Sequence, residues 1–361
     1  MSARPRPRDL GLAPGTLPSG PTASVLDVPG VGLGHATLVR DEPAPPLGRG
    51  TARTGVTCLL LAEDAYRRPV PAGGAVLNGA GECTGFLSAA EWGAAETPVY
   101  LTSTMQLGRV YDAACTIALE GDAGVADDVV IPVVGECDDS WLNDCRRMQV
   151  TEDDVRAAHA AAVASVGAAA PPPTGAVGAG TGMSCLGFKG GIGTASRVLP
   201  DGTTVAVLLL TNFGTREELR VDGVAVGRAW PSAGGPGTTE PDRPAGSCLG
   251  LVVTDAPVDG AGCARLARRI GLGLARVGSV AHHGSGEIFL GFSTGLRLDR
   301  DQRPDGPARS GRDLDPLFTA VVDATEEAVY DSLLSAPTTV GRDGHVSEGL
   351  DAEVLQGLLR G

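Results

Sequence analysis

The chain has 361 residues, 42% of them hydrophobic and 20% charged, so its composition supports a filled core and excludes wholesale disorder. A formal net charge of −14 repels phosphate backbones and anionic lipid, so we expect neither nucleic acid nor a membrane surface as a partner. The 53 glycines follow no G-X-Y period, which excludes a collagen-like fold. Residues 1–20 show no apolar secretory segment, and we expect a cytoplasmic protein.

Strands and helices alternate through the first half of the chain. Apolar runs and hydrophobic spacing predict short strands within 25–39, strands at 55–61, 74–77, 99–102 and 129–134, and helices over 84–92 and 107–119. Thr151 and Asp154 are placed to cap an Ala-rich helix that runs to about residue 166.

The second half opens with a glycine-rich stretch, 178–193, that contains Lys189, to which we assign no role. The remaining patterns predict strands at 194–198, 203–210, 249–254 and 287–292, and helices over 261–277, 317–334 and 347–359. Residues 231–245 lack periodicity and read as a flexible linker. The blocks of strands and helices indicate one α+β layered sandwich over 1–361.

Cofactor and metal motifs are weak in this sequence. The Gly-rich turn 79–85 has the position of a dinucleotide fingerprint, but residues 100–105 lack the acidic residue that should follow, so a tight turn is the better interpretation. There is no P-loop motif, and the five histidines offer only one adjacent pair. The eight cysteines contain no C-x-x-C pair and are expected to be small buried hydrophobes. We therefore expect neither a cofactor nor a metal.

The junction between Gly246 and Ser247 indicates a reactive site more strongly than the cofactor and metal motifs do. A Gly-Ser pair lies directly between the predicted linker and the start of a buried strand. This position suits a serine that cleaves its own chain, because glycine has no side chain to block the approach of the serine hydroxyl to the glycine carbonyl. Cleavage would leave Ser247 with a free α-amine beside its hydroxyl, a nucleophile and a potential base in one residue. On the dipeptide alone, a Gly-Ser that merely ends a loop is the commoner case.

Several blocks, in order, resemble the DmpA/BapA-type L-aminopeptidase/D-esterase and β-peptidyl aminopeptidase family. They are AVLNGAGECTGF from Ala75, PVVGECDDSWLND from Pro132, GTGMSCLGFKGGIGTASR from Gly180, LLLTNFGTREELRVDGVAVG from Leu208, GSCLGLVVTDAPV from Gly246 and GSGEIFLGFST from Gly284. The resemblance implies a four-layer αββα sandwich related to the N-terminal nucleophile hydrolases, self-cleavage into 1–246 and 247–361, and assembly into homotetramers.

The same resemblance implies the catalytic residues. Ser247 matches the nucleophile of both self-cleavage and turnover, and Ser285 and Glu287 match the family's supporting Ser and Glu. Strand alternation puts these last two on one side of one strand. Asn212 matches a side-chain amide that helps form the oxyanion hole; on local sequence alone, a turn-forming Asn is about equally probable.

Substrate-binding residues are implied in the same way. Glu136 matches an acid that binds the free amino terminus of the substrate, and Asn78 and Gly79 match residues that line the same pocket. Asp138 departs from the family, since some members carry Tyr there, and Trp141 is the nearest aromatic residue. This departure leaves the second oxyanion donor and the shape of the acyl pocket open.

The resulting hypothesis is a metal-independent serine aminopeptidase that releases small N-terminal residues from peptides, amides or esters through an acyl-enzyme on Ser247. An amidase on internal or unnatural amide oligomers, like the nylon-oligomer hydrolases that share this architecture, is the alternative within the enzyme class. A catalytically silent relative that acts as a binding protein is the alternative from another class.

Overall fold

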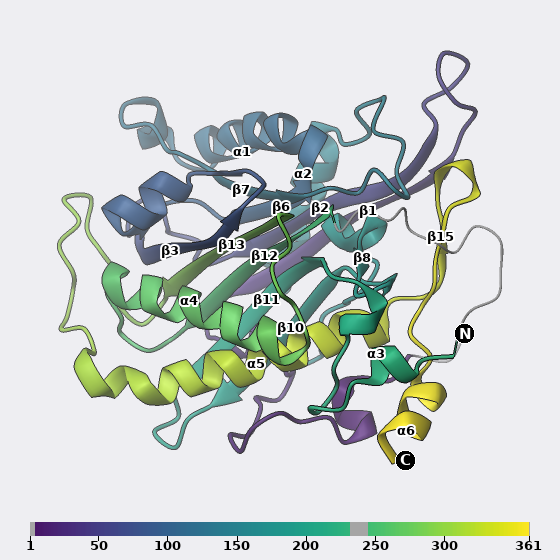
Figure 1. Ribbon diagram of the computed structural model, residues 1–361. Helices are drawn as coiled ribbons and strands as arrows, with labels where there is room; N and C mark the ends of the chain where they lie inside the picture. Colours follow the sequence, from purple (N-terminus) through teal and green to yellow (C-terminus); the bar gives the residue numbers. More distant parts are fainter. Residues whose placement is uncertain (1–3, 232–244, 361) are drawn as a thin grey trace.

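A computed structural model describes residues 4–231 and 245–360, and it arranges them in four layers (Figure 1). The predicted linker 231–245 lies outside the described residues except at its two ends. Its last residue, Ala245, already belongs to a strand, β12.

The first layer of strands is a five-stranded sheet with the order β1-β2-β6-β7-β4, in which only β6 and β7 are parallel. Its strands are β1 (Gly32–Asp41), β2 (Thr51–Leu60), β6 (Val99–Ser103), β7 (Val133–Cys137) and β4 (Cys83–Thr84).

The second layer of strands is a six-stranded sheet with the order β10-β11-β12-β13-β3-β5, in which only β12 and β13 are parallel. Its strands are β10 (Ile192–Val198), β11 (Thr204–Asn212), β12 (Ala245–Thr254), β13 (Gly284–Ser293), β3 (Val70–Gly79) and β5 (Ala94–Ala95). Two short pairs complete the strands: β8 (Ser184–Cys185) with β9 (Phe188–Lys189), and β14 (Thr339–Val340) with β15 (Val346–Ser347).

Helices form the two outer layers. The α-helices are α1 (Leu107–Gly121), α2 (Glu152–Ala164), α3 (Val226–Ala229), α4 (Gly260–Arg276), α5 (Asp315–Ser335) and α6 (Ala352–Arg360). The shorter helices are η1 (Pro7–Leu10), η2 (Val25–Asp27), η3 (Ser88–Trp92), η4 (Thr104–Gln106), η5 (Ala123–Ala126), η6 (Gly178–Gly182), η7 (Arg216–Glu218), η8 (Gly311–Leu314) and η9 (Arg342–Gly344).

Three apolar clusters hold these layers together. One joins α1 and α2 to the five-stranded sheet, one fills the space between the two sheets, and one joins α4 and α5 to the six-stranded sheet. The layer order is therefore helix, sheet, sheet, helix, as Figure 1 shows, and the expected α+β sandwich is confirmed. Burial of apolar area at roughly 25 cal/mol per Å² drives this packing.

Local signals located several elements correctly. Thr151 and Asp154 form the capping box of α2, and Asp259 caps α4 by accepting a hydrogen bond from the Gly262 N–H at 2.8 Å. Six of the eight cysteines are buried, as expected, while Cys115 and Cys145 are half-buried.

Other boundaries were wrong. Residues 25–39 hold the start of one ten-residue strand rather than several short ones. Residues 84–92 do not form one helix, because Thr84 pairs with Val134 in the sheet and helical structure begins only after the positive φ of Gly85. The strand expected from residue 129 begins at Val133, and the last helix begins at Ala352 because the residues around 347 pair with β14. In each case, pairing with another strand overrode the local pattern.

The sheet order brings several strand ends to one edge. Because β12 and β13 are parallel and joined through α4, their first residues lie side by side, with Ser247 opposite Gly286. The antiparallel strands β11 and β3 flank this pair, so Asn212 and Asn78, which lie at or next to the ends of these strands, are at the same edge. Residues from four distant parts of the sequence therefore meet there.

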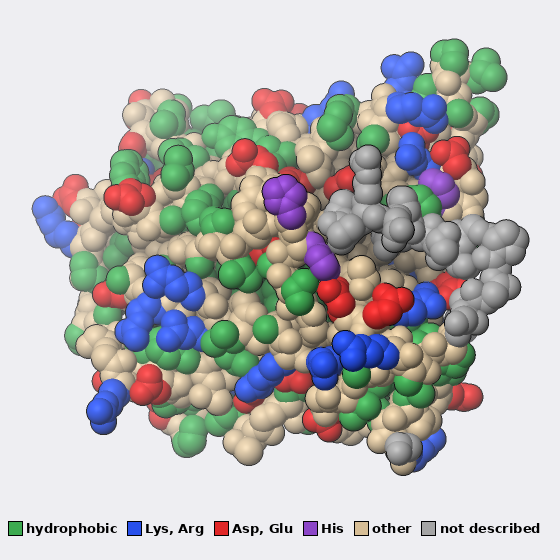
Figure 2. Space-filling view, in the orientation of Figure 1, with side chains coloured by type: hydrophobic (Ala, Val, Ile, Leu, Met, Phe, Trp, Pro, Cys, Tyr) green, Lys and Arg blue, Asp and Glu red, His purple; other side chains and the backbone are tan. Residues whose placement is uncertain are grey.

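Acidic and basic side chains are mixed on the face that Figure 2 shows, with hydrophobic ones scattered among them. A group of basic side chains lies over α4, a helix that carries Arg265, Arg268, Arg269 and Arg276. Within the described ranges, no helix combines the length and the apolar character needed to cross a membrane.

Candidate active site

Ser247, the predicted nucleophile, is buried near the start of β12. Leu249 and Leu251, which alternate with it along the strand, belong to the cluster between the two sheets, so Ser247 faces this space. Its Oγ donates a hydrogen bond of 2.6 Å to the carbonyl oxygen of Gly246. The hydroxyl therefore lies beside the carbonyl group that self-cleavage would attack.

Gly246 is required by a close approach of two strands. A Cβ atom at this position would lie 2.3 Å from the backbone oxygen of Asn212 and 2.9 Å from the Cα atom of Phe213. On its other side, Gly246 pairs in register with Ser285. The chain before Ser247 is thus held tightly between β11 and β13, and any side chain here would push them apart.

Ser285 and Glu287 are in direct contact, as strand alternation predicts. The Ser285 hydroxyl donates to Oε1 of Glu287, and both residues are buried. Burial raises the pKa of Glu287, while the bond from Ser285 and the charge of His282 oppose that rise. Oε2 of Glu287 has no hydrogen-bond partner among the described residues. This buried oxygen is available to a group that arrives later.

Asn212 is held at both ends of its amide. Its Oδ1 accepts a 3.0 Å hydrogen bond from the Ser184 N–H, and its Nδ2 donates a 2.9 Å bond to the carbonyl of Asp138. An amide nitrogen carries two hydrogens, so one remains for a ligand. Because Asn212 pairs in register with Ser247, its amide is fixed next to the candidate nucleophile.

Lys189, whose role the sequence left open, is fully buried and holds three backbone carbonyl groups together. Its Nζ donates to the carbonyls of Gly180, Met183 and Gly190 at 3.0, 2.6 and 2.7 Å. The Met183 carbonyl belongs to the same peptide group as the Ser184 N–H that holds Asn212. Lys189 therefore supports Asn212 through a single peptide bond. Burial lowers the pKa of Lys189 to about 7.

This burial predicts how stability depends on pH. Between pH 7 and the ordinary lysine pKa near 10.4, the unfolded chain binds a proton that the folded chain has released, so stability rises with pH. From pH 7 to 8.5 the expected gain is about 1.5 kcal/mol. Buried thiols such as Cys58, which ionise only in the unfolded chain, oppose this gain over the same pH range, so the lysine contribution is measured as a difference between the chain with Lys189 and Lys189→Met.

Urea unfolding at half-unit steps from pH 7 to 8.5 measures this gain, in a Ser247→Ala background that keeps the chain in one piece. Lys189→Met should lower stability at every pH and should lose the rise. The difference in unfolding free energy between the two proteins should grow by about 1.5 kcal/mol across this window, and a constant difference would contradict the prediction.

Glu136, at the end of β7, is buried and holds its carboxylate between two donors. Oε1 accepts a 2.8 Å bond from the Glu82 N–H, and Oε2 accepts from the Thr104 hydroxyl. Burial raises its pKa, and these two hydrogen bonds oppose that rise. Across residues 4–231 and 245–360, no Lys, Arg or His forms an ion pair with Glu136. The site therefore has a buried carboxylate that lacks a counter-charge.

The turn after β3 connects Glu136 to the strand edge. An added Cβ at Gly81 would lie 3.2 Å from Oε1 of Glu136 and 3.8 Å from the Cα atom of Gly286, the register partner of Ser247. Gly79 pairs with the same Gly286. This turn, considered above as a dinucleotide fingerprint, instead supplies the Glu82 N–H that binds the Glu136 carboxylate.

Asn78 fixes the loop that precedes β13. Its Nδ2 donates to the carbonyls of His282, at 3.0 Å, His283, at 3.1 Å, and Ser285. The amide therefore binds protein backbone and holds Ser285 in place, and its place in the lining of the substrate pocket stays a prediction.

Asp138, where the sequence departs from the family it resembles, and Trp141, the nearest aromatic residue, both lie in the loop after β7. The Asp138 carboxylate is exposed and accepts from the backbone and hydroxyl of Ser140, while its own carbonyl binds Asn212. Trp141 stacks on His345 with ring centroids 3.6 Å apart. Asp138 therefore contributes its backbone, and not its side chain, to the site.

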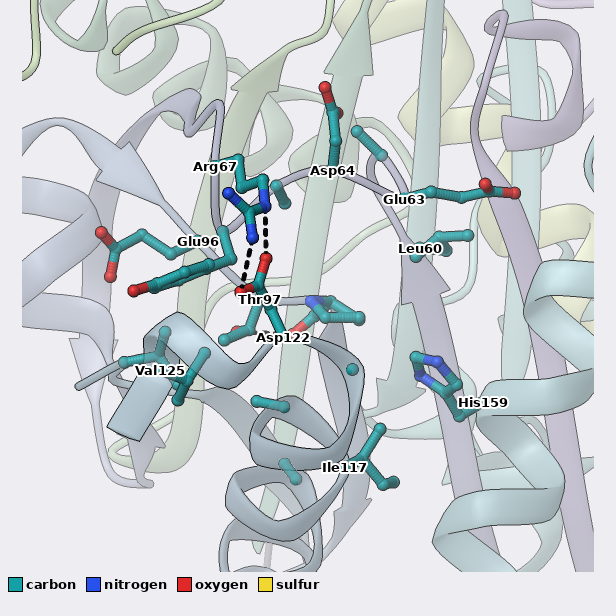
Figure 3. Close-up of a pocket in the computed structure, with 18 of the residues that line it drawn as sticks. Leu60, Glu63, Asp64, Arg67, Glu96, Thr97, Ile117, Asp122, Val125 and His159 are labelled. Atoms are coloured by element: carbon teal, nitrogen blue, oxygen red, sulfur yellow. Dashed lines mark hydrogen bonds and ion pairs between the residues drawn. The ribbon is translucent and has the colours of Figure 1, made fainter. Parts of the chain in front are cut away.

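A separate pocket of about 580 Å³ lies between the five-stranded sheet and the helices α1 and α2 (Figure 3). Its walls are mostly apolar, and four of its polar groups form two pairs: Arg67 pairs with Asp122 at 2.5 Å, and Tyr100 bonds His159 at 3.0 Å. None of the predicted site residues lines this pocket. It is therefore distinct from the candidate active site.

Sequence reasoning missed several supporting residues. Thr104, the Glu82 N–H and the Asp138 carbonyl hold the predicted side chains in place, but their own residue types carry no distinctive chemistry. The sequence did contain an indication for Lys189. A single lysine in a glycine-rich stretch that is buried has few side chains near it, so backbone carbonyls are its expected partners.

Known proteins are similar to this chain in sequence and fold over nearly its whole length. The model of peptidase family S58 matches residues 23–347. The beta-peptidyl aminopeptidase BapA of Sphingosinicella xenopeptidilytica is 36% identical over 382 residues, covering 99% of this chain and 92% of that protein. A solved Burkholderia sp. beta-aminopeptidase matches with a TM-score of 0.86 and 37% identity, covering 99% of this chain and 98% of its own.

The solved L-aminopeptidase D-Ala-esterase/amidase of Ochrobactrum anthropi matches with a TM-score of 0.88 and 35% identity, covering 99% of this chain and 98% of its own. It is described as a prototype for the serine aminopeptidases and as a new variant of the Ntn hydrolase fold. These similarities extend over nearly the full chain, so they include every element that carries a candidate site residue.

Proposed function

The chain belongs to peptidase family S58 and is a serine aminopeptidase, and we propose that it activates itself by cutting the bond between Gly246 and Ser247. The observation that carries the proposal is the 2.6 Å contact between the Ser247 hydroxyl and the Gly246 carbonyl at the buried start of β12. A hydroxyl held there is close to the atom it has to attack, which favours an intramolecular reaction.

Self-cleavage would proceed in two steps. The Ser247 Oγ attacks the carbonyl carbon of Gly246, the peptide C–N bond breaks, and the hydroxyl proton ends on the new α-amine of Ser247. Water then hydrolyses the resulting ester. The products are the chains 1–246 and 247–361, with Ser247 at the new amino terminus.

Turnover would use the same hydroxyl. Ser247 attacks the carbonyl carbon of the substrate, its α-amine takes the hydroxyl proton, and that proton passes to the leaving group as the acyl-enzyme forms. In this proposal the free Oε2 of Glu287 stabilises the protonated amine, and the remaining N–H of the Asn212 amide binds the oxyanion. Water then releases the acyl group.

Glu136 would select substrates with a free amino terminus. Its buried carboxylate lacks a counter-charge within the described residues, and a substrate ammonium supplies one. A blocked terminus would leave the carboxylate unpaired. This argument favours an aminopeptidase acting on small N-terminal residues of peptides, amides or esters over an amidase on internal amide bonds.

We propose two further properties, the second of them from the family resemblance. They are a cytoplasmic location and a homotetramer of the cleaved pair of chains. A catalytically silent binding protein is not supported, because the family and its similar members are peptidases.

A panel of aminoacyl p-nitroanilides tests the function. Gly, L-Ala, D-Ala and β-Ala derivatives, with N-acetyl-L-Ala as control, are assayed on self-cleaved protein. We expect at least one free-amine substrate to be hydrolysed with a kcat/KM at least about 100-fold above that of the acetylated control, which corresponds to about 2.7 kcal/mol. Equal hydrolysis of the blocked substrate would favour the amidase alternative.

A further inference from the structure

The loop between α4 and β13, residues 277–283, is bound to the segment that follows β11. The Arg220 N–H donates to the Val277 carbonyl at 2.9 Å. Gly278, at φ +108, approaches so closely that an added Cβ would lie 1.9 Å from the Glu218 carbonyl oxygen. Two strands that carry site residues are therefore connected outside the sheet, beyond the ends that bear Asn212 and Ser285.

The His282 ring adds a side-chain hydrogen bond to these backbone contacts between the two segments. Its Nε2 donates to Oε1 of Glu218 at 2.7 Å, and both side chains are largely shielded from water. The other carboxylate oxygen, Oε2, accepts a 2.8 Å bond from the Thr215 N–H, three residues after Asn212. Glu218 therefore fixes His282 and the start of its own segment at once.

The His282 carbonyl binds the other side of the site. It accepts a 2.8 Å bond from the Ser285 N–H and a 3.0 Å bond from Nδ2 of Asn78. One residue thus links the ends of β11, β13 and β3. Its neighbour Ala281 has φ +51, a left-handed conformation that a non-glycine residue keeps only where surrounding contacts enforce it.

We propose that His282 is a positioning residue for the Ser247 reaction, because its ring on Glu218 fixes the peptide whose carbonyl holds Ser285 and Asn78. The proposal rests on the proposed function, with Ser285 in the supporting role that the family resemblance implies. Without the ring contact, the strained loop relaxes and Ser285 moves with it. A displacement of about 1 Å in a catalytic group lowers a rate by about 100-fold.

The position of His282 and Glu218 predicts which kinetic constants change when their contact is lost. Substrate binding depends on Glu136, on the other sheet, so KM should stay within about twofold while the acylation rate constant and kcat fall together. A single side-chain contact that keeps part of its surface in water contributes little to folding, so the unfolding midpoint should change little.

The test compares His282→Ala, His282→Gln and His283→Ala, each purified as the self-cleaved form. His283 is exposed and adjacent, which makes it the matched control. With the best substrate of the p-nitroanilide panel, we expect His282→Ala to lose 10- to 100-fold in kcat, and His282→Gln, which keeps an N–H donor toward Glu218, to recover most of this loss. His283→Ala should match the wild type.

Glu218→Ala and the double variant with His282→Ala complete the experiment. The double variant should be no slower than the slower single variant, because both changes break one contact. Wild-type kcat in His282→Ala, or a loss that Gln does not restore and that follows a lower unfolding midpoint, would overturn the proposal. Failure of the wild type itself to form an acyl-enzyme, seen by mass spectrometry, would instead overturn the proposed function.

Discussion

Ser247→Ala should remain a single chain of 361 residues and lose its hydrolase activity, whereas the wild type should separate into fragments 1–246 and 247–361. The methyl side chain has no oxygen to attack the Gly246 carbonyl or the substrate. Because the two reactions share one nucleophile, both should stop together. Loss of a nucleophile lowers kcat by on the order of 10⁴-fold or more.

Denaturing gel electrophoresis with N-terminal sequencing measures the cleavage, and p-nitroaniline release measures turnover. Ser310→Ala, which removes an exposed hydroxyl, is the matched control and should cleave and turn over like the wild type. Circular dichroism of Ser247→Ala should match the wild type, because the hydroxyl is replaced without creating a large cavity. Two fragments from Ser247→Ala, or one intact chain from the wild type after prolonged incubation, would refute Ser247 as the cleaving nucleophile.

Glu136→Gln should reduce kcat/KM for free aminoacyl p-nitroanilides by about 30- to 1,000-fold. The isosteric amide can still accept from the Glu82 N–H, but it leaves the substrate ammonium without its buried counter-charge. Losing one partner of a buried ion pair amounts to roughly 2–4 kcal/mol, which corresponds to this range. The acetylated substrate needs no such partner, so its rate should change little.

Burial adds a pH signature to this second prediction. The carboxylate must be ionised to bind an ammonium, and its pKa is raised, so activity should fall with decreasing pH at a higher pH than an ordinary glutamate near 4.3 would give. In Glu136→Gln, the part of the acid limb that comes from this group should disappear, leaving any contribution from Glu287.

Glu82→Gln is the matched control, because it removes an exposed charge in the turn that contacts Glu136 and should change kcat/KM by no more than about twofold. If Glu136→Gln hydrolysed free-amine substrates at the wild-type rate, the amino terminus would have to be recognised elsewhere.

The sequence by itself determined the elements that depend on neighbouring residues. The helical spacing of hydrophobic residues predicted α1, α2, α4 and α5, and capping residues predicted where α2 and α4 begin. The Gly246-Ser247 junction stood out because a nucleophile, a small neighbour and a buried strand follow one another directly. Family blocks then supplied the other candidate residues. These features are readable because their physical causes lie within a few residues of one another.

Only the tertiary structure decided how the candidate residues are held. Asn212 binds the backbone of Asp138 from the other sheet, and Asn78 binds backbone more than 200 residues away. The raised pKa of Glu136, the clamp formed by Lys189 and the link through His282 likewise depend on partners that sheet order brings together. Desolvation and contact geometry are properties of packed layers, so a linear pattern names the reactive groups but not the partners that orient them.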